Sequence, residues 1–149
     1  TEEAKDDPRL RIPEIRVASL AYAMRPQGPA AIIGPGGGTD VLSALRAGVQ
    51  KVVGTGDFIH FHKGWIPDTF VGLEDKKICF AHIDLDLYQG VKDTLEYVYP
   101  RMPAGGGIIS DDYGLASCPG ARRAVDEFFE GKPEKPLALL TGQVLVIKL

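Results

Sequence analysis

The clearest hydrophobic pattern lies in the second half of the chain, where two apolar runs flank a helical repeat. Residues 78–83 and 107–110 are mostly apolar, as expected of buried strands. Between them, residues 91–99 carry apolar side chains at helical spacing, and prolines follow. A strand, a helix and a second strand over this distance predict a right-handed βαβ unit, so both strands end at the same edge of a parallel sheet.

Each of these two strands is followed by a pair of acidic residues, Asp84 and Asp86 after the first and Asp111 and Asp112 after the second. Because both carboxyl ends meet at one edge, we expect the four carboxylates to converge. Like charges at short range raise one another's pKa or require a cation. A hard divalent metal binds oxygen ligands, so the pattern indicates a metal site.

Alternatives stay open for these carboxylates. Alternate residues of a strand point to opposite faces, so a structural role for Asp86 competes with a catalytic one. Asp111 and Asp112 have the alternative of capping the turn after their strand. His82, two residues before Asp84, is expected to be a core residue or a partner of a metal ligand.

A glycine-rich turn in the first third of the chain separates a strand, Ala30–Ile33, from a helix at about residues 40–47. The turn consists of Gly34, Pro35, Gly36, Gly37 and Gly38. Glycines let the backbone pass close to a ligand, and a helix N-terminus offers free N–H groups. We predict that this turn binds the cofactor at the end of the central strand; a plain tight turn is the alternative.

The pattern becomes irregular after this helix. Residues 51–55 and 58–63 predict two strands that only Gly56 and Asp57 separate, whereas parallel neighbours need a crossover of a dozen or more residues. Three explanations of this short connection are open: an antiparallel hairpin, a deleted segment, or missing residues that the numbering has closed up. We favour a deletion or junction. The acidic residue that usually holds a cofactor ribose is missing unless Asp57 replaces it. An interrupted crossover leaves a sheet edge uncovered, so we expect a homodimer.

The remaining pattern completes an α/β fold. Residues 119–130 predict an amphipathic helix, and residues 137–140 and 144–149 predict two strands joined by a tight turn. The order of elements predicts a single three-layer Rossmann-like domain over residues 1–149. Its sheet is mainly parallel, with an antiparallel C-terminal hairpin, and it is shortened between the second and third strands.

Composition narrows the function classes. A chain of 149 residues with 44% hydrophobic residues is an ordinary globular domain with one core. A net charge of -3 and scattered basic residues argue against nucleic acid as a partner. No apolar run is long enough for a membrane, and the acidic residues 1–7 do not resemble a signal peptide, so we expect a cytoplasmic protein. Cys79 and Cys118 disfavour a disulfide framework and supply too few soft ligands for a zinc site.

Four segments resemble the macrocin-type (TylF-like) O-methyltransferases: FHKGW at 61–65, HIDLDLY at 82–88, GGIISDDYG at 106–114 and GARRAVDEF at 120–128. The resemblance runs from about Asp57 to Leu149 and is quite specific. It implies the class I S-adenosylmethionine-dependent methyltransferase fold, with S-adenosylmethionine as cofactor and Mg²⁺ orienting a sugar hydroxyl. It also implies Asp84, Asp111 and Asp112 as metal ligands, with Asp84 as a candidate base.

The segment Ala30–Thr55 instead resembles the start of spermidine-synthase-like class I proteins, which suggests a chimera or an internal deletion near Thr55. The expected function is Mg²⁺-assisted O-methyl transfer to a hydroxyl of a sugar-containing or other small natural product. A recombined Rossmann-like scaffold without turnover is one alternative. The other is a metal-dependent nucleotide-sugar glycosyltransferase, because residues 84–86 also match an Asp-x-Asp motif.

Overall fold

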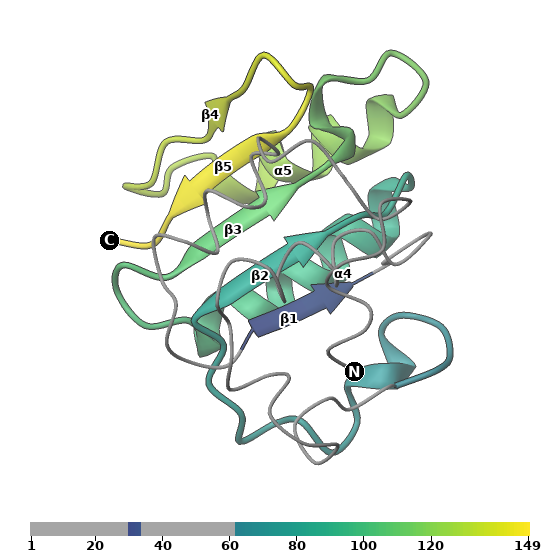
Figure 1. Cartoon of the computed structure of the whole chain (residues 1–149), viewed down its shortest axis with the longest axis vertical. Helices are drawn as coiled ribbons and strands as arrows, with labels where there is room; N and C mark the ends of the chain where they lie inside the picture. Colours follow the sequence, from purple (N-terminus) through teal and green to yellow (C-terminus); the bar gives the residue numbers. More distant parts are fainter. Residues whose placement is uncertain (1–29, 34–61) are drawn as a thin grey trace, which may run out of the picture.

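The computed structural model describes residues 30–33 and 62–149, which form a five-stranded sheet with two helices on one face (Figure 1). The strands are β1 (Ala30–Ile33), β2 (Phe80–Ile83), β3 (Gly107–Ser110), β4 (Leu137–Ala138) and β5 (Val144–Ile147). Their order is β1-β2-β3-β5-β4; β1, β2 and β3 are parallel, and β5 is antiparallel to both β3 and β4. The predicted α/β fold, with a mainly parallel sheet and an antiparallel C-terminal hairpin, is confirmed.

Helix α4 (Tyr88–Val98) connects β2 to β3, as the apolar repeat predicts. It buries Val91, Leu95 and Val98, which lie one turn apart and face the sheet. The helix begins three residues before the predicted residue 91, because the Val91 N–H donates to the Leu87 carbonyl at 3.2 Å. That first turn carries few apolar side chains, so periodicity does not mark it. A short 3-10 turn, η4 (Tyr99–Arg101), contains the proline that ends the repeat.

Helix α5 (Pro119–Phe129) packs beside α4 on the same face of the sheet (Figure 1). Proline at its first position suits a helix start, and Gly131, with φ of 75°, follows its end. A Cβ atom on Gly120 would lie 2.9 Å from the Tyr88 backbone nitrogen. The absence of a side chain at this glycine therefore lets α5 begin close against α4.

The strands are shorter than predicted at several ends. The run at residues 137–140 pairs only through Leu137 and Ala138, because the Gly142 N–H donates to the Leu139 carbonyl at 3.1 Å and closes the turn early. His62 and Lys63, predicted as the end of a strand, lie in irregular chain. Neither described helix has the length and apolar character needed to cross a membrane.

Several predicted features lie outside the described residues. These are the glycine turn at residues 34–38, the helix at 40–47, the strands up to residue 61, Asp57 and the irregular connection near Thr55.

Candidate active site at the carboxyl ends of the strands

The parallel register brings the acidic residues to one edge of the sheet. Ile33 of β1 pairs with Ile83 of β2, which in turn pairs with Ser110 of β3. The ladder continues for one step, since the Asp84 N–H donates to the Ile33 carbonyl and the Asp111 N–H to the Ile83 carbonyl, both at 2.9 Å. Backbone hydrogen bonds therefore place Asp84 and Asp111 at neighbouring strand ends, as the βαβ pattern predicts.

Asp111 is held by side chains from two other segments. The Nε2 atom of His82 lies 3.0 Å from the Oδ1 atom of Asp111, and Gln143 Nε2 donates to the same oxygen. His82 is fully buried within β2, which confirms it as a core residue and partner of this carboxylate. Asp111 precedes a 3-10 turn, η5 (Asp112–Gly114), but its side chain makes no capping hydrogen bond. The capping alternative is therefore wrong for Asp111.

Asp112 has a very different environment from its neighbour in sequence. The residue is only 6% exposed, and its Oδ2 atom accepts no hydrogen bond from the described part of the chain. Burial raises the pKa of Asp112 to about 6, with further contributions from the negative charges of Asp86, Asp84 and Asp111. The other three acidic residues thus all act on the charge of Asp112, as their convergence predicts. Ionisation of Asp112 is therefore more costly than that of an exposed aspartate, and a nearby cation would offset this cost.

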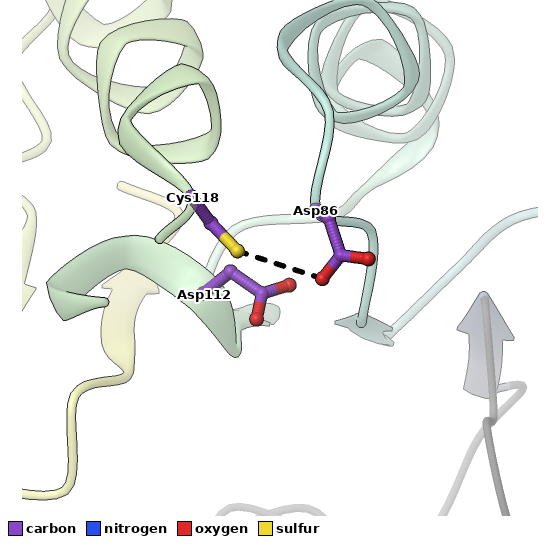
Figure 2. Close-up of side chains that lie close together, drawn as sticks. All are labelled: Asp86, Asp112 and Cys118. Atoms are coloured by element: carbon purple, nitrogen blue, oxygen red, sulfur yellow. Dashed lines mark hydrogen bonds between the residues drawn. The ribbon is translucent and has the colours of Figure 1, made fainter. Parts of the chain in front are cut away.

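Among the described residues, Asp86, Asp112 and Cys118 form a group whose side chains could together hold a metal ion (Figure 2). Their ligand atoms all lie within 4.8 Å of one another, and the Cys118 thiol donates to Asp86 Oδ1 at 3.6 Å. The Asp86 side chain therefore faces Asp112 and Cys118. Of the predicted metal ligands, only Asp112 belongs to this group. Asp84 and Asp111 share the edge and contribute to the field at Asp112.

Two residues of this region, Cys118 and Gln143, are not among the predicted site residues. Cys118 is the residue directly before α5, a position that usually carries Ser, Thr, Asp or Asn, and this departure was the one available signal. Gln143 lies in the turn between β4 and β5. Its proximity to Asp111 depends on the pairing of β5 with β3, so no local pattern reveals it.

The C-terminal hairpin is also tied to the acidic edge through its backbone. The Gly114 N–H donates to the Gly142 carbonyl at 2.6 Å, which connects η5 to the turn before β5. A Cβ atom on Gly114 would lie 2.8 Å from the Gly142 Cα atom, so the two segments meet this closely only because residue 114 is a glycine. The hairpin therefore helps to set the position of Asp112, the first residue of η5.

Comparison with curated proteins gives relatives over part of the chain. The chain is 34% identical over 87 residues to the 8-demethyl-8-(2,3-dimethoxy-alpha-L-rhamnosyl)-tetracenomycin-C 4'-O-methyltransferase of Streptomyces olivaceus. It is 37% identical over 70 residues to the demethyldecarbamoylnovobiocin O-methyltransferase of Streptomyces niveus. These matches cover 58% and 47% of this chain, but only 32% and 26% of the two relatives. The chain thus matches about a third or less of the length of each.

Solved structures share the fold. The O-methyltransferase NovP superposes with a TM-score of 0.58 and 26% identity, covering 72% of this chain and 44% of NovP. The O-methyltransferase TomG from Streptomyces achromogenes superposes with a TM-score of 0.68, covering 99% of this chain and 86% of TomG. At 14% identity, the likeness to TomG shows the fold alone.

The family profile described as macrocin O-methyltransferase (TylF) matches residues 43–138. The matched range begins inside the segment Ala30–Thr55, so residues on both sides of Thr55 match one family. The match includes all four acidic residues, His82 and Cys118. The chain therefore belongs to the macrocin O-methyltransferase (TylF) family.

Proposed function

We propose that the protein transfers a methyl group from S-adenosylmethionine to a hydroxyl of a small, sugar-containing natural product, with Mg²⁺ bound at the acidic edge of the sheet. The observation that carries this proposal is the convergence of four carboxylates there, with Asp112 buried and its Oδ2 atom without a described partner. Family membership supports methyl transfer. The names of the relatives, which include a rhamnosyl-tetracenomycin 4'-O-methyltransferase, support a glycosylated acceptor.

The proposed cofactor position follows from the strand arrangement. Ligands of open α/β sheets bind beyond the carboxyl ends of the strands. β1 ends at the same edge as Asp84, and the chain continues from β1 into Gly34, Pro35 and the glycines 36–38. We propose this glycine turn, together with Asp57, as the part that binds S-adenosylmethionine.

The residues of the acidic edge suit a magnesium ion. Mg²⁺ prefers oxygen ligands, and one or two protein carboxylates usually suffice because the ion retains several waters. We propose Asp84, Asp111 and Asp112 as its ligands, with His82 and Gln143 orienting Asp111. When bound, the ion supplies Lewis acidity that lowers the pKa of a coordinated hydroxyl.

The protein's own residues then have two tasks, to align the hydroxyl with the methyl donor and to accept its proton. We propose Asp84 as the base, since it follows β2 directly and is half-buried at the edge. Asp86 is a second candidate because it is exposed while adjacent to Asp112, so a substrate can reach it. The variants Asp84→Asn and Asp86→Asn separate these roles, since loss of the base lowers kcat more than it changes substrate KM.

Calorimetric titration with S-adenosylmethionine, a UDP-sugar and Mg²⁺ tests the proposal against its alternatives. Methyltransferase function requires binding of S-adenosylmethionine. Mg²⁺-dependent binding of the UDP-sugar alone would support a glycosyltransferase, and binding of neither would support a scaffold without turnover. Transfer of a labelled methyl group to a glycosylated acceptor would then establish the reaction. The proposed homodimer is tested separately by light scattering at micromolar concentration, where a strictly monomeric species would contradict it.

A further inference from the structure

The group formed by Asp86, Asp112 and Cys118 shares Asp112 with the proposed magnesium ligands but adds a thiol. It combines two carboxylates with a thiol, and its members come from three separate segments: the chain before α4, the start of η5 and the residue before α5. Thiolate is a soft ligand that Mg²⁺ does not favour and that Zn²⁺ binds well. The mixed ligand set therefore suits a different ion from the one assigned to the neighbouring carboxylates.

The spacing within the group agrees with tetrahedral zinc. Typical Zn–S and Zn–O distances of about 2.3 Å and 2.1 Å place a sulfur and an oxygen about 3.6 Å apart when both bind one tetrahedral ion. The Cys118 sulfur and Asp86 Oδ1 are 3.6 Å apart. All three ligand atoms lie within 4.8 Å of one another, so Asp112 also lies close to this position.

A second observation comes from Asp112. Its side chain is buried, with 6% of the residue exposed, and lies where Asp86 and Cys118 meet (Figure 2). Its Oδ2 atom accepts no hydrogen bond from any described residue. A buried carboxylate oxygen without a partner is costly, and a cation beside it would remove that cost.

We propose that Asp86, Asp112 and Cys118 bind Zn²⁺ as a three-ligand site whose fourth position is open to water. On binding, the Cys118 thiol loses its proton to solvent and forms the Zn–S bond, so one proton is released per ion at that residue. The sequence predicts too few soft ligands for zinc, but one thiol with two carboxylates is enough for an open site. Competition with Mg²⁺ for Asp112 is a consequence that rests on the proposed function; zinc binding itself does not.

Titration of the metal-free, untagged protein with Cd²⁺ tests the site, because a thiolate-to-cadmium charge-transfer band reports a bound cysteine. The band should appear at one equivalent and disappear when Zn²⁺ is added. Cys118→Ser should abolish the band and weaken Zn²⁺ binding by at least about tenfold. Cys79→Ser is the matched control. Cys79 is also a half-buried free cysteine but lies outside the group, so this variant should keep the band.

Two further variants keep the outcome clear. Asp86→Asn should weaken Zn²⁺ binding without removing a thiol, whereas Asp126→Asn, an exposed carboxylate on α5, should leave it unchanged. Cys118→Ser should retain its melting temperature and its stabilisation by Mg²⁺, which separates a failed zinc site from a failed magnesium site. Wild-type Zn²⁺ affinity in Cys118→Ser, or loss of the band in Cys79→Ser, would overturn the proposal.

Discussion

Two carboxylates are buried in the described part of the chain, and they lie at opposite edges of the sheet. Asp112 lies at the carboxyl edge of the parallel strands, whereas Glu134 lies near the other edge, where β5 ends. Each has one oxygen without a described partner. Despite this similarity, the pKa of Asp112 is raised and the pKa of Glu134 is lowered.

The difference comes from the groups around each carboxylate. Burial opposes ionisation of Glu134, but hydrogen bonds from its own backbone, the Tyr99 hydroxyl and the Leu149 N–H outweigh it, with help from the Lys148 charge. The Tyr99 and Leu149 donors lie 2.9 and 3.2 Å from Glu134 Oε1. Asp112 is instead surrounded by other carboxylates. Hydrogen bonds and a nearby positive charge therefore stabilise Glu134 as an anion, whereas burial and neighbouring negative charges oppose the ionisation of Asp112.

The largest effect on stability is expected when Glu134, the carboxylate that accepts hydrogen bonds, is removed. Glu134→Ala should lower the free energy of unfolding by about 3 kcal/mol at pH 7, because two donors lose a charged acceptor. Urea unfolding measures this change. The folded-state pKa lies below the usual 4.5, so the Glu134 contribution is complete above that pH and is lost as pH falls through the folded value. Exposed Glu130→Ala is the control and should change stability by less than about 0.5 kcal/mol.

Displacing Asp112 without changing its charge should have a smaller effect on the free energy of unfolding. Gly114→Ala places a Cβ atom against the Gly142 backbone and should lower the free energy of unfolding by about 2 kcal/mol, since backbone cannot yield as a side chain can. It should also reduce stabilisation by Mg²⁺, measured as the shift in melting temperature. Gly90→Ala in α4 is the control, because its nearest neighbour is the flexible Leu85 side chain. An unchanged Mg²⁺ response in Gly114→Ala would show that the hairpin does not position Asp112.

Removing the charge of Asp112, which its neighbours oppose, should stabilise the metal-free protein. In EDTA at pH 7, Asp112→Asn should raise the free energy of unfolding by roughly 1–2 kcal/mol, because burial and three neighbouring carboxylates oppose its charge. The folded pKa of about 6 lies above the usual 3.8, so wild-type stability should fall as pH rises through that window. The gain should vanish below about pH 4 and reverse when Mg²⁺ is added. If Asp112→Asn were less stable than wild type in EDTA, the contrast drawn between Asp112 and Glu134 would be wrong.

The smallest effect concerns the orientation of Asp111. Gln143→Leu removes one donor to its carboxylate while the His82 donor remains, so stability should fall by only about 0.5–1 kcal/mol. The apparent Mg²⁺ affinity, obtained from melting temperatures across a titration, should fall by a few fold because a less ordered ligand binds more weakly. Leu140→Ala is the control, because this side chain in the same turn is exposed. Equal Mg²⁺ responses in both variants would argue against a positioning role for Gln143.

The sequence by itself determined the elements that depend on local pattern. Apolar periodicity predicts β2, α4 and β3, and the handedness of a βαβ unit places the residues after both strands at one edge. Asp84 and Asp111 are found there for that reason. The helix at α5 follows from its apolar spacing and the glycine after it. The predicted glycine turn and Asp57 lie outside the described residues and remain predictions.

Only the tertiary structure decided how adjacent acidic residues differ. Asp111 and Asp112 are consecutive, yet Asp111 meets His82 and Gln143, while Asp112 enters η5 and faces Asp86 and Cys118. Sequence spacing cannot separate these roles, because they depend on the pairing of β5 with β3 and on where α5 docks against α4. Electrostatic environment follows from distances between segments remote in the chain, and those distances exist only after the sheet and both helices have packed.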